Sequence, residues 1–282
     1  PEVMARVRAP AVTGLALPEE LGGAGMGNLA LPRVLEEVNR GCASTGVTLS
    51  VHNSLVCAPI NKYGTDAQKK QWLPKLAAGE ILGAYALTEP NSGSDAAALS
   101  TRAVRDGDHY VLDGTKIWVT TGSLAGLVIV YARTNPDVPK AKGITAFLVD
   151  ASTPGYEVGK HEKKVGIRGS PAVELQFTNM RVPADCVLGE VDRGFPIALD
   201  TLDGGRIGIG AQAVGIGRAC IDAAVKYSKE RTQFGRPISA FQAIQWKRAD
   251  MSARIDAARL LVHKAAWLLD RGEPCGREAA EA

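Results

Sequence analysis

Apolar residues in the first part of the chain recur at helical spacing. Residues 29–40 carry them at steps of three and four, which places them on one face of a helix. A second apolar helix is predicted over residues 47–63, and a third opens with a capping box at Thr65. The residues that this third helix is expected to turn inward are Trp72, Leu73 and Leu76. The pattern therefore predicts an N-terminal helical domain over residues 1–80.

The period changes to short alternating runs over residues 81–193. Asp106-Gly107 and Asp113-Gly114 separate three of these runs, and Asp-Gly is a strong signal for a tight hairpin turn. Clusters of Pro and Gly separate the later runs. We expect an antiparallel β-domain, either a barrel or a sandwich. The expected strands cover residues 103–105, 109–112, 116–119, 127–132, 144–149 and 173–177.

Helical spacing returns over residues 194–282. A Gly- and Ala-rich helix is predicted over about 205–231, and a long amphipathic helix follows it. The apolar stripe of the second helix comprises Ile244, Met251, Ile255, Ala258, Val262, Ala265 and Leu269. The fold class is therefore α+β, with an N-terminal helical bundle, a central β-domain and a C-terminal helical bundle that is incomplete. The expected domains are residues 1–80, 81–193 and 194–282.

Composition narrows the function classes. The net charge of +3 comes from 33 basic and 30 acidic residues, so no global charge argues for nucleic acid or an anionic membrane. The 5 cysteines are scattered without a CxxC pair, which indicates reduced thiols, and the 4 dispersed histidines indicate no metal site. No apolar run is long enough for a membrane span. We expect a cytoplasmic protein, or a mitochondrial matrix protein in a eukaryote.

Residues 85–95 join the helices to the strands and change from an apolar run into a polar loop. Pro90 holds Glu89 extended, and Gly93 permits a turn closed to other residues. Hydroxyls and exposed N–H groups in such a loop suit a heterocycle edge or a phosphate. Taken alone, the loop fits a solvated turn with local side-chain caps better.

A tryptophan among hydroxyls ends the predicted meander, at Thr115-Lys116-Ile117-Trp118-Val119-Thr120-Thr121-Gly122. Its flat apolar face beside hydrogen-bond donors is what an aromatic cofactor ring requires. The commoner alternative for an isolated motif of this kind is a core tryptophan in a strand.

Together the two segments resemble the acyl-CoA dehydrogenase family. The family signature stands here as Ala86-Leu87-Thr88-Glu89-Pro90 with Gly93-Ser94-Asp95, and its flavin-facing Trp-x-Thr as Trp118-Val119-Thr120. Further matches run through nearly all of the chain in the family's order, and the short- and branched-chain branch is nearest. They include residues 18–23, 40–45, 164–170 and 201–206, then Arg231-x-x-Phe234-Gly235-x-Pro237 and Gln242.

The resemblance implies FAD as cofactor, an acyl-CoA substrate, a homotetramer and an electron-transfer flavoprotein as electron acceptor. The residues it assigns to FAD within one subunit are Tyr85, Leu87, Thr88, Gly93, Ser94, Trp118, Val119 and Thr120. Arg231, Phe234 and Gln242 would contact the FAD of a neighbouring subunit. The residues it assigns to the acyl-CoA are Ser94, Asp203, Gly204, Gly205 and Arg206. The implied reaction is α,β-dehydrogenation to a trans-2-enoyl-CoA.

The family's catalytic base is a glutamate at one of two positions, and the chain has a glutamate at neither. One position lies in a Tyr-Glu-Gly-type segment near the C-terminus, and the other corresponds to Gly205. No catalytic residue is therefore assigned in this chain. We expect a truncated enzyme that lacks its N-terminal helix, its C-terminal helices and its base. The alternatives are a non-catalytic FAD- or CoA-binding homologue that serves as a structural partner, and an oxidase variant that passes electrons to oxygen.

Overall fold

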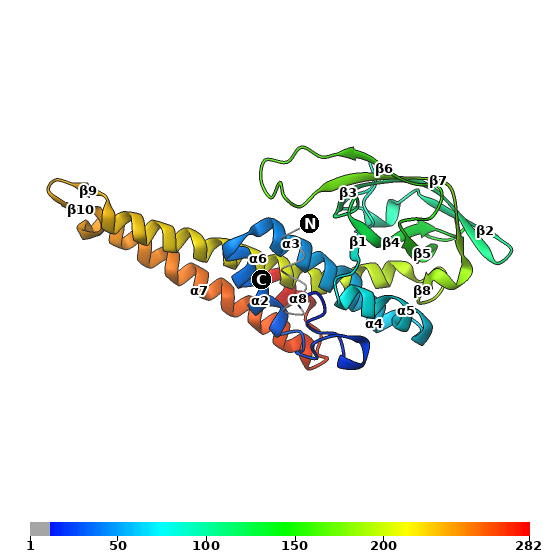
Figure 1. Cartoon of the computed structure of the whole chain (residues 1–282), viewed down its shortest axis with the longest axis horizontal. Helices are drawn as coiled ribbons and strands as arrows, with labels where there is room; N and C mark the ends of the chain where they lie inside the picture. The colour runs from blue at the N-terminus through cyan, green and yellow to red at the C-terminus, as the bar shows by residue number, and fades with distance from the viewer. Residues whose placement is uncertain (1–11) are drawn as a thin grey trace.

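The computed structural model describes residues 12–282. Along the chain, helices precede and follow a sheet-forming middle section, and the last two long helices extend sideways as an arm (Figure 1). The prediction of a missing N-terminal helix lies outside the described residues. None of the helices in this range has the length and apolar character needed to cross a membrane.

The N-terminal helices form where the apolar spacing predicts them. They are α2 (Ala30–Gly41), α3 (Ala43–Ser50), a π-helical segment (Val51–Cys57), α4 (Ala58–Tyr63) and α5 (Asp66–Ala77). The capping box at the start of α5 is confirmed, since the Thr65 hydroxyl accepts from the Gln68 backbone and the Gln68 side chain accepts from the Thr65 backbone. Trp72, Leu73 and Leu76 are buried, as predicted.

The middle section is a mainly antiparallel sheet. Its strands are β1 (Leu82–Ala86), β2 (Arg102–Asp106), β3 (His109–Thr120), β4 (Ala125–Arg133), β5 (Ile144–Asp150), β6 (Tyr156–His161), β7 (Ala172–Pro183) and β8 (Val187–Leu188). Their order is β6-β7-β3-β2-β4-β5-β8, and β1 pairs with β4 in parallel. Because β1 follows directly from the helices, this pairing joins the helical section to the sheet.

One of the two predicted Asp-Gly turns is wrong. Asp106-Gly107 does connect β2 to β3, with Gly107 at φ +62°. Asp113-Gly114 instead lies inside β3, at a bulge in the pairing with β7. Gly114 is needed there for close approach, because a Cβ would lie 2.5 Å from Oγ1 of Thr101. The second expected hairpin is therefore one continuous strand.

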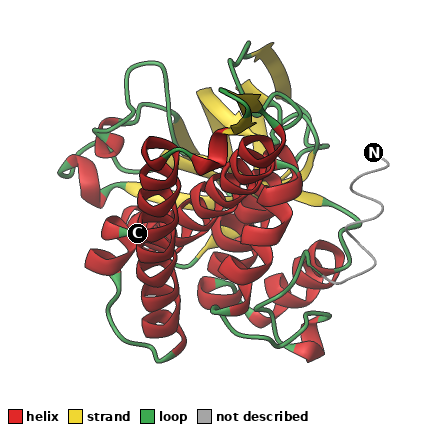
Figure 2. Cartoon of the chain, turned by 90° about the vertical axis from the view of Figure 1, so that its left-hand side faces the viewer, coloured by secondary structure: helices red, strands yellow, loops and turns green. Residues whose placement is uncertain are grey.

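The C-terminal section consists of antiparallel helices. α6 (Gly194–Glu230) and α7 (Gln242–Asp270) are joined by a small hairpin of β9 (Thr232–Gln233) and β10 (Arg236–Pro237), and α8 (Gly276–Glu281) follows. Helix α6 begins at Gly194, before the predicted start at about residue 205. The predicted stripe of α7 faces inward, with Val262 and Ala265 fully buried and the other members partly buried. In Figure 2 the helices lie in front of the sheet.

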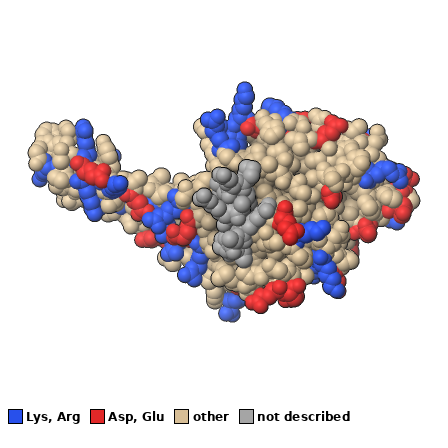
Figure 3. All heavy atoms as spheres, in the orientation of Figure 1, with Lys and Arg blue, Asp and Glu red and all other residues tan. Residues whose placement is uncertain are grey.

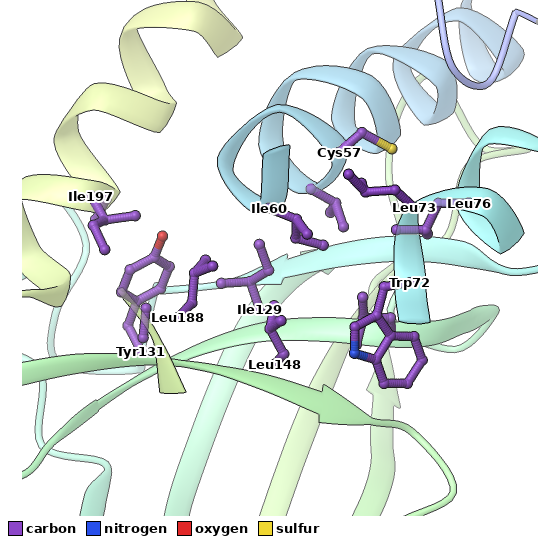
Figure 4. Close-up of a cluster of buried hydrophobic side chains, with 14 of the residues drawn as sticks. Cys57, Ile60, Trp72, Leu73, Leu76, Ile129, Tyr131, Leu148, Leu188 and Ile197 are labelled. Carbon is purple, nitrogen blue, oxygen red and sulfur yellow. The ribbon is translucent and has the colours of Figure 1, made fainter. Parts of the chain in front are cut away.

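A buried apolar layer fixes the helices on the sheet (Figure 4). Ile60, Leu73 and Leu76 meet Ile129 and Leu148 of the central strands in this cluster. Burial of apolar surface at about 25 cal/mol per Å² makes such a cluster the main stabilising contact between the sections. On the face drawn in Figure 3, basic and acidic side chains are interspersed along the arm.

Candidate cofactor and substrate site

The two signature segments lie side by side at the junction of helices and sheet. The Ile117 N–H donates to the Thr88 carbonyl at 2.9 Å. The Lys116 ammonium donates to the Leu87 carbonyl at 3.0 Å. Segments that are 27 residues apart in sequence, from Glu89 to Lys116, therefore form one wall.

A buried ion pair stands behind this wall. The Lys116 ammonium lies 2.8 Å from Oε1 of Glu89, and the side chains are 0% and 3% exposed. The Glu89 carboxylate also accepts from the Ser100 N–H and hydroxyl and from the Thr101 N–H, at 2.6–2.9 Å. Desolvation disfavours its charge, but Lys116 and these hydrogen bonds outweigh that cost and lower the pKa of Glu89 to about 2.

Trp118 is turned outward from the sheet. Simple alternation from Lys116 would bury Trp118 on the same face. Trp118 instead adopts φ +58°, and the β3–β7 register shifts between Lys116 and Val119. The bulge therefore buries Val119 and leaves Trp118 55% exposed. The alternative of a core tryptophan is wrong.

The other predicted cofactor residues of this wall differ in what they present. Leu87 is buried, Thr88 and Thr120 are half-buried, and Gly93 and Ser94 are exposed in the turn after Pro90. Val119 packs in the core of the sheet, so only its backbone is available to a cofactor. The hydrogen bonds from Ile117 to Thr88 and from Lys116 to Leu87 bring the Thr88 segment beside the Trp118 segment.

Tyr85 is the inner edge of the site. Its hydroxyl donates to the Ala198 carbonyl at 3.4 Å, which links β1 to α6. Its ring lies 5.1 Å from the ring of Tyr131, and burial raises its pKa well above the usual value. The hydroxyls of Tyr131 and Thr201 are buried without a partner in the described residues. Sequence reasoning missed both hydroxyls, because nothing in the local pattern indicates that β4 and α6 meet here.

The predicted substrate residues lie near the start of α6. Asp203 Oδ1 and the Arg206 guanidinium pair at 2.5 Å across one helical turn. Asp203 and Gly204 line a cavity of about 820 Å³ between the π-helical segment, α6 and the α7–α8 loop. Thr88 and Trp118 are not among its lining residues. Gly205 is buried, and a Cβ there would lie 2.6 Å from Cδ2 of Leu55.

The remaining predicted FAD contacts are far from this wall. Arg231 ends α6, Phe234 is at the tip of the hairpin, and Gln242 begins α7, so all three are at the outer end of the arm (Figure 1). Phe234 is 92% exposed and has φ +51°. The structure therefore separates the predicted FAD residues into a wall and an arm tip that do not meet within one chain.

Two charged residues were missed as site residues. Glu89 and Lys116 are part of the signature segments, yet neither was assigned a role. The available signal was a lysine in the middle of an apolar strand, since a lysine is almost never buried without a partner.

Family models cover the chain in the order of its three sections. They describe the acyl-CoA dehydrogenase N-terminal, middle and C-terminal domains and match residues 1–80, 84–180 and 192–282. The "Acyl-CoA dehydrogenase, short-chain specific" of Clostridium acetobutylicum is 46% identical over 269 residues, which is 95% of this chain and 71% of that protein. The chain belongs to the acyl-CoA dehydrogenase family. Homologues in this family are FAD-dependent flavoproteins.

Two further relatives show how much of a family member is present. The mitochondrial short-chain specific acyl-CoA dehydrogenase of Bos taurus is 50% identical over 266 residues, which is 94% of this chain and 64% of that protein. The structure of butyryl-CoA dehydrogenase from Megasphaera elsdenii matches with a TM-score of 0.98 and 44% identity, over 100% of this chain and 74% of that chain. The chain thus spans less than two thirds of the first of these relatives and about three quarters of the second.

The wall fits the isoalloxazine ring of FAD. A large indole held outward by a left-handed backbone is unfavourable in water and calls for a covering group. Thr120 follows Trp118 by two residues, and the Thr88 carbonyl accepts a hydrogen bond from the N–H of Ile117, so two hydroxyl-bearing residues belong to the segments that meet at Trp118. A flat apolar face together with nearby hydrogen-bonding groups suits a flavin ring, which has a flat face and a polar edge.

Proposed function

We propose that the chain carries most of the site of an FAD-dependent dehydrogenase that converts short- or branched-chain acyl-CoA thioesters into trans-2-enoyl-CoA. The observation that carries the proposal is the wall of Thr88, Trp118 and Thr120, in which the indole faces outward. When bound, FAD accepts the β-hydrogen of the substrate as hydride. Membership of the acyl-CoA dehydrogenase family supports the substrate class.

In this proposal, the residues of the chain hold and orient the cofactor and the substrate. Trp118 would cover the flavin ring, and the hydroxyls of Thr88 and Thr120 would hydrogen-bond its polar edge. Ser94 lies in the exposed turn on the CoA side. Arg206 is a fixed cation for a CoA phosphate once its pairing with Asp203 is exchanged.

The assembly is part of the proposal. Arg231, Phe234 and Gln242 lie on the arm, so they reach FAD only from a neighbouring subunit, as in a homotetramer. Electrons then pass to an electron-transfer flavoprotein.

The carboxylate that removes the α-proton is proposed to come from outside these 282 residues. Gly205 occupies one position where the base would stand, and Asp203, two residues earlier, is paired with Arg206. The chain therefore supplies the flavin side of the reaction and not the base side.

Anaerobic flavin bleaching tests this proposal. The protein is reconstituted with FAD, butyryl-CoA is added, and the flavin absorption bands are followed. Because a general base contributes about 10²–10⁴-fold, we expect flavin bands but slow bleaching. Absence of flavin bands contradicts the cofactor, and rapid bleaching shows that a residue of the chain is the base.

A glutamate at position 205 sharpens the same test. Gly205→Glu brings its Cβ to 2.6 Å from Leu55, so it is combined with Leu55→Ala to make room. We expect this double variant to bleach faster than the parent. The matched control is Gly205→Gln with Leu55→Ala, which has the same shape and no base, and equal rates for the two double variants would show that position 205 does not reach the α-carbon.

A further inference from the structure

Glu89 and Lys116 are sequence neighbours of the residues that face the flavin. Glu89 directly follows Thr88, and Lys116 stands two residues before Trp118. The pair is joined at 2.8 Å, and both side chains are buried. Any displacement of the pair is therefore passed through one or two peptide units to the wall of the site.

Both oxygens of Glu89 and two of the three N–H donors of Lys116 are hydrogen-bonded. Both oxygens of Glu89 accept hydrogen bonds, from Lys116 and Thr101 at Oε1 and from Ser100 at Oε2. The Lys116 ammonium also donates to the Leu87 carbonyl. Neither group has access to solvent, so neither is placed to exchange a proton with a substrate.

Stability alone is a weak reason for such a pair. Burial of two charges has a desolvation cost that their attraction only partly offsets, and well-packed apolar residues of similar volume are often as stable. A charged pair with several hydrogen bonds does fix distance and direction, which apolar packing does less strictly. The pair therefore gives this junction geometric definition.

We propose that Glu89 and Lys116 are positioning residues of the cofactor site, whose buried ion pair fixes the Thr88 and Trp118 segments against each other before FAD binds. This inference rests on the proposed FAD site. The backbone hydrogen bond from the Ile117 N–H to the Thr88 carbonyl joins the direct neighbours of Lys116 and Glu89, so it depends on the same alignment of the two segments. Trp118, with its left-handed φ, is held outward by this arrangement.

The chain offers a matched control for loss of a buried carboxylate. Glu36 of α2 is fully buried and is bound by Arg218, Arg259 and His263, at 2.6–3.3 Å. It belongs to the helical section and does not contact the signature segments. Glu36→Gln thus removes an equally enclosed charge without touching the proposed wall.

Hydrogen exchange of the FAD-free protein is the first arm of the test. In Glu89→Gln, amides of residues 85–95 and 113–121 should exchange about ten-fold faster or more, while Glu36→Gln leaves them as in the parent. This arm needs no cofactor, so it judges the pair even if FAD does not bind. Unchanged exchange in Glu89→Gln overturns the proposal.

FAD affinity and the visible circular dichroism of bound flavin are the second arm. Coupling in such a network corresponds to roughly ten- to hundred-fold weaker FAD binding by Glu89→Gln, with an altered flavin dichroism at saturating FAD. Glu36→Gln should keep both parental values, although it is destabilised. If Lys116→Met or Glu89→Gln does not fold, the double variant Glu89→Gln/Lys116→Met, which carries no unpaired charge, replaces it.

The outcomes separate two failures. If the parent binds no FAD, the proposed cofactor is wrong, and the exchange arm alone decides on the pair. If the parent binds FAD and Glu89→Gln or the double variant binds it equally with the same dichroism, the positioning role is overturned.

Discussion

The signature wall and the arm tip are both assigned to FAD, yet they are built in opposite ways. Thr88 and Trp118 are fixed from behind by the buried pair of Glu89 and Lys116. Arg231 and Phe234 stand on a two-helix arm, exposed, with no such support. In the proposed site, a half that is supported within one chain is combined with a half that a neighbouring subunit supplies.

The two halves also differ in what their conformations imply. Trp118 and Phe234 are both large aromatic residues with positive φ and exposed rings. In the proposed site, FAD bound to the same chain covers Trp118. The arm tip lies at the far end of the structure, so the FAD that Phe234 is proposed to contact belongs to another subunit (Figure 1).

The largest expected effect is on the wall. Lys116→Met leaves Glu89 buried and unpaired, which costs about 3–5 kcal/mol of unfolding free energy. Arg231→Ala, on the exposed arm, should change it by less than about 0.5 kcal/mol. Urea unfolding of both variants measures the contrast. Similar losses in the two variants would mean that the wall is not held from behind.

Acid should remove the stabilisation that Glu89 gives to the wall. The folded pKa of Glu89 is about 2, below the usual 4.5, so its contribution is present above pH 4.5 and is lost as the pH falls toward 2. The whole effect is on the order of 3 kcal/mol. Unfolding free energies measured between pH 6 and pH 3 should fall more steeply for the parent than for Glu89→Gln. Parallel pH profiles would contradict this assignment.

Arg231 on the arm should affect the affinity for FAD and leave the free energy of unfolding nearly unchanged. Arg231→Ala removes charge-assisted contacts worth about 1.5–3 kcal/mol each, so FAD binding should weaken by roughly one to two decades. Calorimetric titration with FAD measures this, and gel filtration shows whether oligomers weaken as well. The control is Lys229→Ala, which removes an exposed positive charge two residues before Arg231, in the last turn of α6. Parental FAD affinity in Arg231→Ala would mean that this helix end is simply solvated.

Local patterns predicted the helices and most strands. The Thr65 capping box and the Asp106-Gly107 turn depend on residues close in sequence, and both are confirmed. The role of Asp113-Gly114 was misjudged because Gly114 packs closely against Thr101, which directly precedes β2. The π-helical segment Val51–Cys57 was read as regular helix, since its spacing remains apolar.

The candidate site was predictable in its residues and not in its construction. The resemblance gave Thr88, Trp118 and Thr120 as cofactor residues, and in the structure the segments of Thr88 and Trp118 are joined by the hydrogen bond from Ile117 to Thr88. The outward turn of Trp118 depends on a bulge against β7, and the burial of Lys116 depends on Glu89 from a distant loop. Such pairings between distant segments are not visible in a local period.

Subunit complementation tests most directly whether the wall and the arm tip belong to different subunits of one FAD site. A Trp118→Ala chain and an Arg231→Ala chain are produced with different affinity tags, separately and together, and bound flavin is measured after purification through both tags. Each variant alone should retain little FAD. The mixed oligomer should recover up to half of the parental flavin, because the intact wall of one chain meets the intact arm of the other. No recovery above the separate variants would contradict the account.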